Sequence, residues 1–584
     1  MHVFLDLMWF FKTRKKHYTI GILLLISVSF IGLFPPRIIG RFVDHVQHHT
    51  LTAQFVWLSV VSIGLMAPAM YVLRYYWRVL LFGSAIELST TLRLRLFQHL
   101  SKMSPTFYQK HRVGDLMAHA TNDIQAVEST ATDGILTLVD SISTGLLVIA
   151  TMAVTIDWKL TIAALLPMPI MAYTTSRYGN ILHRRFEVAQ AAFSDLNDKV
   201  HESVNGVRAI KAFGQEDNDI ASFSALSQDV VQKNMAVARI DALFDPTIQV
   251  IVGASFFLAF AVGAVFVVHH QLTLGDLTSF SIYLGQLIWP MLAFGFLFNI
   301  VERGRASHDR VQAILSIAPD IVDPPHALHH VESGDLTYQI QRFVYPGSHD
   351  AALLDVQFTL KPGQTLGVVG KTGSGKTTLL RLLLREFDVD DGDIFIGEHT
   401  IYGVTLDEVR RHIAYVPQDH FLFSASVADN IAFGRFGATR DEIESVAKLA
   451  SVHDDILGFP QGYDTLVGER GVTLSGGQKQ RISIARALLL DTDILMLDDC
   501  LSAVDARTEA AILAGIKSRG GRQTTLIATH RLSAVEHADL ILVLQGGRIS
   551  ERGTHSELMA KRGWYATMYE HQQLEAMVEQ GGAV

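Results

Sequence analysis

The stretch Gly370-Lys371-Thr372-Gly373-Ser374-Gly375-Lys376-Thr377 decides the fold of the second half of this chain. It follows an apolar run, 365–369, that predicts a buried strand, and it precedes an apolar run, 378–384, that predicts a helix. Glycines let the backbone curl without Cβ clashes, so several N–H groups can point into one concavity. The helix N-terminus adds partial positive charge, which suits a phosphate group. The pattern therefore predicts a nucleoside triphosphate site, in which Lys376 reaches the β- and γ-phosphates and the Thr377 hydroxyl holds Mg²⁺.

The bulk composition places part of this chain in a membrane. At 584 residues it is too long for a single domain. Hydrophobic residues make up 49% of the sequence and charged residues only 18%, a balance that is unusual for a soluble enzyme. The net charge of −9, without a long stripe of Lys or Arg, argues against a nucleic-acid partner. Cys500 is the only cysteine in the sequence, so no intrachain disulfide can form.

Six apolar runs in the first half have the length of membrane-spanning helices, which need about 20 residues. They cover residues 18–40, 55–81, 134–156, 159–176, 246–268 and 278–301. Short connections poor in Lys and Arg alternate with two connections of more than 50 residues that are rich in both. The positive-inside bias predicts that the N-terminus, both long connections and the C-terminal half are cytoplasmic. Helical periodicity in the long connections predicts helices that continue beyond the bilayer and turn at a tip.

These patterns divide the chain into domains. Residues 1–318 form the predicted all-α transmembrane domain, 319–335 a linker, 336–570 an α/β domain and 571–584 a polar tail. In the α/β part, short β-rich runs alternate with helical ones, which is typical of a sheet covered by helices. The predicted strands cover residues 336–340, 365–369, 413–416, 494–497, 525–528 and 540–544.

Two further motifs belong to the α/β domain. Asp498 and Asp499 follow the apolar run 494–497, and Asp498 fits the role of holding Mg²⁺, directly or through water. The segment Leu474-Ser475-Gly476-Gly477-Gln478 precedes a predicted helix over 479–490. Ser-Gly-Gly alone would be an ordinary turn with a helix cap. When the same segment lies between a phosphate loop and a strand that ends in paired acids, it specifically indicates a nucleotide-binding domain.

With these motifs, the chain resembles the ABC transporter superfamily over essentially its whole length. The first half resembles the six-helix membrane domain of ABC exporters with long cytoplasmic extensions. The second half resembles their α/β P-loop nucleotide-binding domain, fused to the first in one half-transporter. The resemblance implies an ATP hydrolase coupled to transport, with ATP and Mg²⁺ as cofactors, in the cytoplasmic membrane of a bacterium. It also implies membrane lipids, a small hydrophobic substrate and a second half-transporter as partners.

The resemblance assigns roles to individual residues. Tyr345 would stack on adenine, Gln418 would touch Mg²⁺ and sense the membrane domain, and His530 would lie near the γ-phosphate. The implied ATP-binding residues are Tyr345, Gly370, Lys371, Thr372, Gly373, Ser374, Gly375, Lys376, Thr377 and Thr378. The implied Mg²⁺ ligands are Thr377, Gln418 and Asp498, and the implied catalytic residues are Asp499, His530 and Gln418.

Other segments would act between subunits. The signature Leu474, Ser475, Gly476, Gly477 and Gln478 would complete the ATP site of a partner subunit, in trans. The D-loop would consist of Ser502, Ala503, Val504 and Asp505. The tips of the long cytoplasmic helices would be coupling helices, near 106–115 and 205–213.

One position departs from the family pattern. The residue after the Mg²⁺-binding aspartate is normally a glutamate that orients the attacking water, and here it is Asp499. The aspartate carboxylate lies about 1.5 Å further back, and misplacement of about 1 Å can cost on the order of 10²-fold in rate. The combination with an intact signature resembles the degenerate-site subunit of bacterial heterodimeric multidrug exporters. The site would then bind ATP and hydrolyse it slowly, whereas a homodimer that tolerates aspartate is the alternative.

The sequence leaves three functions open. The first is efflux of hydrophobic or amphipathic compounds by alternating access. The second is a homodimeric lipid flippase of the same fold, and the third is an ATP-gated channel or membrane sensor. Asp140 lies inside an apolar run, where it would contact a cationic drug or bond a neighbouring helix. The predicted outer loops carry histidines that would be solvated, or would bind metal or sense pH; they are His45, His48, His49, His269 and His270.

Overall fold

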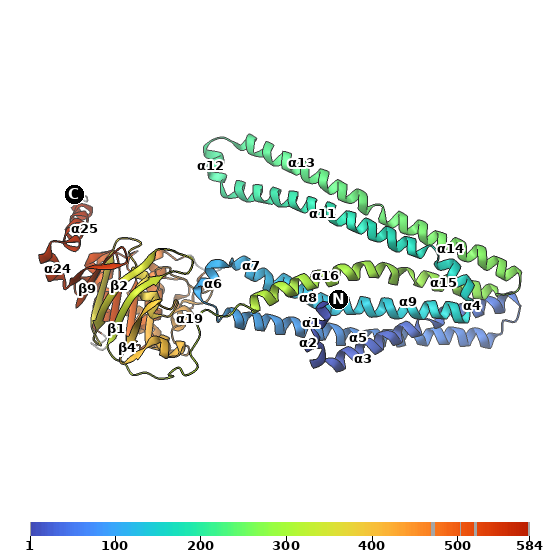
Figure 1. The fold of residues 1–584 in the computed structure, drawn as a ribbon, viewed down its shortest axis with the longest axis horizontal. Coiled ribbons are helices and arrows are strands. Elements are labelled where there is room, and N and C mark those ends of the chain that lie inside the picture. Colours follow the sequence, from blue (N-terminus) through green and yellow to red (C-terminus); the bar gives the residue numbers. More distant parts are fainter. Residues whose placement is uncertain (1, 469–473, 503, 519–522, 582–584) are drawn as a thin grey trace. The chain divides into compact units, whose positions relative to one another are not determined.

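The computed structural model describes residues 2–468, 474–502, 504–518 and 523–581. The chain divides into two compact units (Figure 1). The helical unit contains Met1–Ser101 and Arg112–Ile317. The α/β unit contains Lys102–His111 and Ala318–Val584. A short segment that precedes the third predicted membrane helix is thus part of the α/β unit.

The helical unit is built from helices of very different length. Its elements are α1 (His2–Asp6), α2 (Met8–Thr13), α3 (Lys15–Ile31), α4 (Phe34–Gln47), α5 (Ala53–Leu100), α7 (Val113–Ala118), η1 (His119–Asp123), α8 (Ile124–Ser129), η2 (Thr130–Gly134), α9 (Ile135–Thr155), α10 (Trp158–Leu165), α11 (Met168–Asn205), α12 (Val207–Ala212), α13 (Glu216–Asp241), α14 (Phe244–Val268), α15 (Leu274–Gln286) and α16 (Ile288–Leu315).

Five helical stretches among the described residues are long and apolar enough to cross a membrane. They are Lys15–Gln47, Ala53–Leu100, Val113–Ile156, Glu216–Val268 and Leu274–Leu315, and each contains one of the predicted runs. The remaining predicted run, 159–176, is divided between α10, which has only 8 residues, and the start of α11. Pro167 lies at the break, because proline disfavours helical conformation in the residue before it and lacks an N–H.

Several helices extend far beyond the length of a membrane crossing. α5 has 48 residues and α11 has 38, although about 20 would suffice. α11 and α13 lie side by side and connect through α12 (Figure 1). The predicted tip at 205–213 therefore coincides with α12, and the prediction that the membrane helices continue into long extensions is confirmed by these helices.

The stretch from α7 to α9 contains two wide turns, the π-helical elements η1 and η2. Both contact α16. Arg310 of α16 donates hydrogen bonds to the carboxylate of Asp123, and Nε lies 3.1 Å from Oδ2. The Thr130 hydroxyl donates to the carbonyl oxygen of Ile300 at 3.1 Å. The two wide turns thus point polar groups at the same neighbouring helix.

The polar residues singled out in the membrane domain make local contacts. The Thr144 hydroxyl lies 3.4 Å from Asp140 Oδ1 and 3.0 Å from Ser29 Oγ, so that a hydroxyl joins the acid to α3. His45, predicted in an outer loop, lies in the last turn of α4, and its Nδ1 is 2.9 Å from Thr50 Oγ1 in the loop that follows. The described part of the chain contains no group of three or more His, Cys, Asp or Glu that could hold a metal ion.

Helices α4 and α15 approach so closely that there is no space for a Cβ on either of two glycines. A Cβ on Gly40 would overlap the carbonyl oxygen of Gly275, and a Cβ on Gly275 would overlap that of Gly40. The Asp44 carboxylate accepts the Gly275 N–H at 2.7 Å, and the Ser279 hydroxyl donates to the Pro36 carbonyl at 3.0 Å. Glycine is required at both positions because the two backbones touch.

Replacing Gly40 by alanine should therefore destabilise the helical unit. The new methyl group can be accommodated only if α4 and α15 move apart, and overpacking of this kind costs about 1–3 kcal/mol. The measurement is the thermal unfolding midpoint of the purified protein in detergent. Gly64→Ala is the matched control, because nothing lies within 4 Å of a Cβ at Gly64. Equal midpoints for the two variants would contradict the close packing.

The α/β unit contains two sheets. Its strands are β1 (Leu336–Val344), β2 (Ala351–Leu360), β3 (Thr365–Gly370), β4 (Asp391–Ile396), β5 (His399–Thr400), β6 (Ile413–Val416), β7 (Ile494–Asp498), β8 (Thr524–Ala528), β9 (Leu540–Gln545) and β10 (Arg548–Gly553). The first sheet is antiparallel in the order β2-β1-β4-β5. The second has the order β10-β9-β3-β8-β7-β6, parallel except for β10. The six predicted strands correspond to β1, β3, β6, β7, β8 and β9.

The helices and short turns of this unit connect the strands. They are α6 (Pro105–Lys110), α17 (Lys376–Leu383), η3 (Ile401–Gly403), α18 (Leu406–Arg411), α19 (Val427–Ala432), α20 (Arg440–Leu449), α21 (His453–Leu457), η4 (Gly462–Asp464), α22 (Gly476–Leu488), α23 (Ala506–Ser518), η5 (Leu532–Val535), α24 (His555–Lys561) and α25 (Trp564–Gly581). Helix α25 continues past 570, so residues predicted as an unassigned polar tail are helical as far as Gly581.

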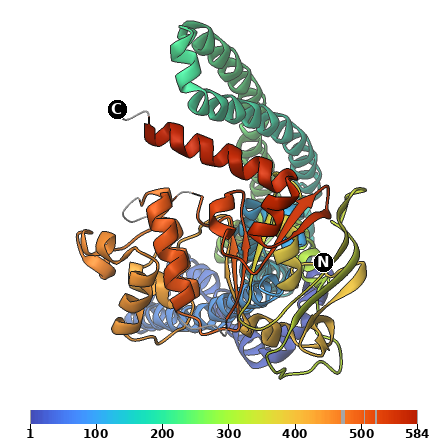
Figure 2. The ribbon, with the colours of Figure 1, turned by 90° about the vertical axis from the view of Figure 1, so that its left-hand side faces the viewer.

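The six-stranded sheet separates two hydrophobic cores. Successive side chains of a strand point to opposite faces, and in β7 Leu495 and Leu497 enter one core whereas Ile494 and Met496 enter the other. The first core includes residues of α19, α20, α22 and α23, and the second includes α17 and the antiparallel sheet. Figure 2 shows the antiparallel strands beside the six-stranded sheet. Burial on both faces explains the continuous apolar runs of β3, β7 and β8.

Segment 102–111 packs on the α/β unit through α6. The Ser104 hydroxyl donates to Asp320 Oδ2 at 2.9 Å. An open groove lies beside the helix, and it is lined by Met103, Pro105, Tyr108, Gln109, Arg381 and Glu386. The predicted coupling segment 106–115 overlaps α6.

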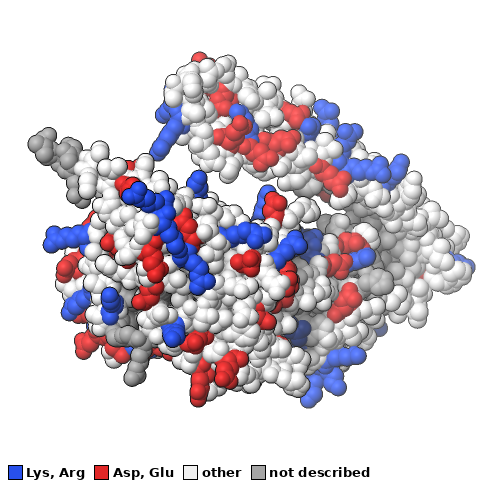
Figure 3. All heavy atoms as spheres, turned by 60° about the vertical axis from the view of Figure 1, so that its left-hand side comes forward, with Lys and Arg blue, Asp and Glu red and all other residues white. Residues whose placement is uncertain are grey.

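On the face of the molecule shown in Figure 3, basic and acidic side chains are interspersed.

Candidate nucleotide-binding site

The phosphate loop joins β3 to α17, as predicted. β3 ends at Gly370, and α17 begins at Lys376 with Gly375 as its N-cap. Gly375 has a φ of 104° and Gly373 a φ of 78°, values that side chains rarely permit. A Cβ on Gly370 would overlap the carbonyl oxygen of Leu544 on the neighbouring strand β9. The loop can therefore take this course only with glycine at these places.

Polar atoms in the loop fit a phosphate group. Lys376 Nζ donates to the carbonyl oxygens of Gly370 at 2.9 Å and Lys371 at 3.1 Å. Burial lowers the pKa of Lys376, so an anionic ligand would stabilise its charged form. The Ser374 hydroxyl is buried, and it has no hydrogen-bond partner among the residues that the structure describes. Because buried polar groups are normally paired, this hydroxyl has a ligand-binding capacity that the protein itself leaves unused.

Two oxygen groups form the site expected to hold Mg²⁺. The Thr377 hydroxyl donates to Asp498 Oδ1 at 3.0 Å, and the Tyr415 hydroxyl donates to Asp498 Oδ2 at 3.1 Å. Asp498 is only 1% exposed, and burial raises the pKa of its carboxyl group. Hydroxyl and carboxylate oxygens are ligands that Mg²⁺ prefers. Thr377 and Asp498 fit the ion, which would supply positive charge to the phosphates when bound.

Asp499 and His530 come together at the ends of adjacent strands. Asp499 follows β7 and His530 follows β8 closely, and Asp499 Oδ1 lies 2.8 Å from His530 Nδ1. The Asp499 N–H donates to the Ala528 carbonyl at 2.7 Å. Asp499 has a φ of 46°, in the left-handed region that aspartate enters more readily than most residues. The imidazole is 54% exposed whereas the Asp499 side chain is only 19% exposed, so the histidine covers the carboxylate on its outward side.

Tyr345 lies close to the phosphate loop. Its hydroxyl donates to Thr378 Oγ1 at 2.9 Å. The Tyr345 ring meets Phe343 and Phe387 edge to face, with centroids 5.0 and 5.1 Å away. The side chain is half-buried. Stacking on adenine stays a prediction for this residue.

Gln418 and the D-loop both follow strands of the six-stranded sheet, Gln418 after β6 and the D-loop after β7. Gln418 is exposed two residues after β6, and among the described residues no hydrogen bond joins it to Asp498. The Ser502 hydroxyl donates to the Asp499 carbonyl at 3.0 Å. Asp505 Oδ1 accepts the N–H of Thr508 at 3.0 Å at the start of α23. Ala503 lies outside the described residues.

The signature segment lies at another place in the unit. Ser475 caps α22, and Ser475 and Gln478 form a reciprocal capping box. Gln478 Nε2 also donates to Asp455 Oδ1 at 3.1 Å, and Leu474 is buried. The N–H groups of Gly476 and Gly477 belong to the first turn of this helix, where anions are favoured. In the described part of the chain, no hydrogen bond or ion pair links the signature to the phosphate loop.

Two residues of the site were not predicted. Tyr415 contacts Asp498, although the two residues are 83 positions apart. Arg531 donates to the carbonyl oxygens of Val504 and Ser502, each at 2.8 Å, and so ties the loop after His530 to the D-loop. A signal for Arg531 was available, because it directly follows the predicted histidine. No comparable local signal marks Tyr415.

Comparison with known proteins agrees with this architecture. The family described as ABC transporter transmembrane region matches residues 18–291, and the family described as ABC transporter matches residues 353–502. The chain is 49% identical over 575 residues to the "Probable multidrug resistance ABC transporter ATP-binding/permease protein YheI" of Bacillus subtilis, covering 98% of both chains. It is 50% identical over 581 residues to the "Multidrug resistance-like ATP-binding protein MdlA" of Escherichia coli, covering 99% of this chain and 98% of the other.

A solved structure shows the same fold. It is described as a bacterial Atm1-family ABC exporter with ATP bound. The match has a TM-score of 0.78 at 27% identity and covers 96% of this chain and 98% of that one. The chain therefore belongs to the ABC transporter superfamily, as an exporter-type half-transporter in which a transmembrane domain is fused to an ATP-binding domain.

Proposed function

We propose that this chain expels hydrophobic or amphipathic compounds across the cytoplasmic membrane of a bacterium by ATP-driven alternating access, as one half of a dimer. The observation that carries the proposal is that one chain combines a complete phosphate loop with apolar helices of up to 48 residues, long enough to cross a membrane and continue beyond it. The names of the relatives, which refer to multidrug resistance, support this substrate class. The N-terminus and the ATP-binding domain would be cytoplasmic.

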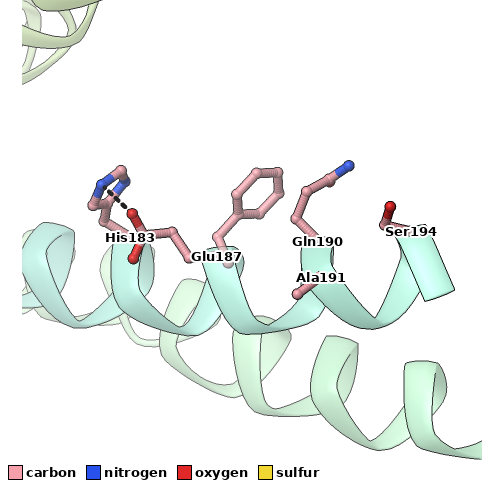
Figure 4. Close-up of a pocket in the computed structure, with 6 residues that line it drawn as sticks. His183, Glu187, Gln190, Ala191 and Ser194 are labelled. Atoms are coloured by element: carbon pink, nitrogen blue, oxygen red, sulfur yellow. Dashed lines mark ion pairs between the residues drawn. The ribbon is translucent and has the colours of Figure 1, made fainter. Parts of the chain in front are cut away.

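Two features support a dimer. The signature at α22 has no bond to the phosphate loop of its own chain among the described residues, so a second phosphate loop can bind there. The helices α11 and α13 also carry large exposed apolar side chains, among them Phe186, Phe193 and Phe223. Figure 4 shows the groove on α11, where His183, Glu187 and Gln190 project from the same side of the helix. A partner subunit would cover such a surface.

The partner is proposed to be a different half-transporter. Asp499 stands where the family has glutamate, and its carboxylate is held by His530 at 2.8 Å. A carboxylate that is one methylene short would orient the attacking water poorly, so this site would act as a slow ATP-binding site. The intact segment Leu474–Gln478 would complete a faster site on the partner.

The ATPase rate of the purified chain tests this asymmetry. The chain alone should turn over ATP slowly, and addition of its partner should restore fast turnover that depends on Ser475 of this chain. Asp499→Asn should have little effect in the complex because the faster site lies elsewhere. Robust turnover by the chain alone, unaffected by Asp499→Asn, would show a homodimer and refute the asymmetric assignment. Uphill transport into vesicles separates a pump from an ATP-gated channel.

A further inference from the structure

Tyr415 occupies an unusual place for a tyrosine, beside the buried carboxylate of the Mg²⁺ site. It lies on β6, which pairs with β7 so that Tyr415 is level with Met496. From there its hydroxyl reaches Asp498 Oδ2 at 3.1 Å. The other oxygen, Oδ1, accepts the Thr377 hydroxyl at 3.0 Å. Each oxygen of this carboxylate therefore has its own hydroxyl donor.

The two hydroxyls differ in what they can do when an ion enters. Thr377 can exchange its hydrogen bond for a bond to Mg²⁺, because its oxygen is a suitable ligand. Tyr415 can continue to donate to Oδ2 while Oδ1 binds the ion. A tyrosine hydroxyl is protonated at physiological pH in its ordinary state, so it is available as a donor to Oδ2.

Tyr415 is also close to charges outside the nucleotide site. Glu386 and Arg381 both act electrostatically on its hydroxyl. Arg381 Nε and Glu386 Oε2 lie 3.7 Å apart, and both residues line the groove beside α6. These two charged residues therefore belong to the part of the unit that holds segment 102–111.

We propose that Tyr415 is a positioning residue for Asp498. Its hydroxyl holds Oδ2 so that Oδ1 stays directed at Thr377, and it thereby sets the affinity of the ATP-loaded site for a divalent cation. The inference rests on the proposed ATP-binding function of this site. Outer partners that orient a metal ligand typically contribute 10- to 100-fold to metal affinity.

Binding of Mn²⁺ to the full-length chain tests this role without requiring hydrolysis. The chain is purified in detergent and saturated with ATP, and bound Mn²⁺ is measured by electron paramagnetic resonance. Tyr415→Phe should weaken Mn²⁺ binding about tenfold. Binding of ATP in EDTA and the unfolding temperature should stay at the values of the unaltered chain. Because no turnover is needed, the result does not depend on whether this site hydrolyses ATP slowly.

Tyr402→Phe is the matched control. Tyr402 lies in the same unit, and its hydroxyl accepts the Val389 N–H at 3.2 Å; among the described residues no hydrogen bond joins it to Asp498. Removal of the Tyr402 hydroxyl should leave the Mn²⁺ affinity unchanged. The inference would be overturned if the Mn²⁺ affinity of Tyr415→Phe lay within twofold of that of the unaltered chain. It would also be overturned if Tyr415→Phe lost ATP binding in the absence of metal to the same extent. Failure of the unaltered chain to bind ATP would instead refute the proposed function itself.

Discussion

Replacing Asp499 by glutamate should raise the rate of ATP hydrolysis at this chain's phosphate loop about 10²-fold. The longer side chain would carry its carboxylate about 1.5 Å further towards the attacking water. In the structure the aspartate carboxylate is instead bound to His530, with 2.8 Å between Oδ1 and Nδ1. The measurement is phosphate release by the purified chain and its complex under single-turnover conditions, with the partner's own site inactivated.

Asp491→Glu controls for the substitution itself. Asp491 is exposed before β7 and has no role in the proposed site. The Asp491→Glu substitution adds the same methylene in the same unit but away from the site, so this variant should hydrolyse ATP at the rate of the unaltered chain. A rate for Asp499→Glu that rises less than twofold would show that the length of this side chain does not limit hydrolysis. The slow-site assignment would then be wrong, although ATP binding would be unaffected.

Replacing Lys376 by methionine should weaken ATP binding about 10- to 100-fold, because hydrogen bonds to charged groups contribute about 1.5–3 kcal/mol. In the structure Lys376 Nζ donates to two carbonyl oxygens of its own loop, at 2.9 and 3.1 Å. A phosphate would offer a negatively charged acceptor to the same group. The measurement is the Kd of a fluorescent ATP analogue on the purified chain in the absence of Mg²⁺.

Lys361→Met provides the comparison for this change. Lys361 lies in the exposed turn before β3, outside the phosphate loop. The Lys361→Met substitution removes the same charge from the same unit, so a general effect of net charge on ATP affinity would appear in both variants. Equal affinities for Lys361→Met and Lys376→Met would contradict the assignment of Lys376 to the phosphates.

The phosphate loop could be predicted because its geometry is encoded locally. The glycines at 370, 373 and 375 adopt positive φ values within a few residues of Lys376, and the flanking apolar runs fix the strand and the helix. The paired acids at the end of β7 were equally visible in the sequence, because they follow a strand that is buried on both faces. Such features need no knowledge of the rest of the fold.

Strands β2, β4, β5 and β10 were not predicted. Residues 354–360 of β2 alternate between apolar and polar side chains, so a signal was present there, whereas β4 and β10 do not alternate in this way. β10 has the sequence Arg-Ile-Ser-Glu-Arg-Gly and lies at the sheet edge, where polar side chains are accepted. β4 begins with Asp-Gly-Asp, which is typical of a turn. In α25, Leu574, Met577 and Val578 have helical spacing, a pattern in the sequence that indicates a helix beyond residue 570.

The contact between Tyr415 and Asp498 depends on strand order. β6 lies beside β7 only because the sheet has the order β10-β9-β3-β8-β7-β6. That order is decided by how the helices cover the sheet, and no pattern within β6 or β7 encodes it. For this reason the sequence predicted Asp498 as a Mg²⁺ ligand but did not predict its hydrogen bond to Tyr415.

The two wide turns η1 and η2 change which side chains share a face along the third membrane-crossing stretch. A helical wheel assumes 3.6 residues per turn, or about 100° per residue. Each π-helical turn takes in about one residue more, so a wheel drawn continuously from Val113 to Ile156 loses about 100° of phase at each of them. The direction of Asp140, downstream of both, therefore has to be measured from η2 onward. A single-residue insertion or deletion in this stretch can be absorbed at a wide turn without rotating the rest of the helix.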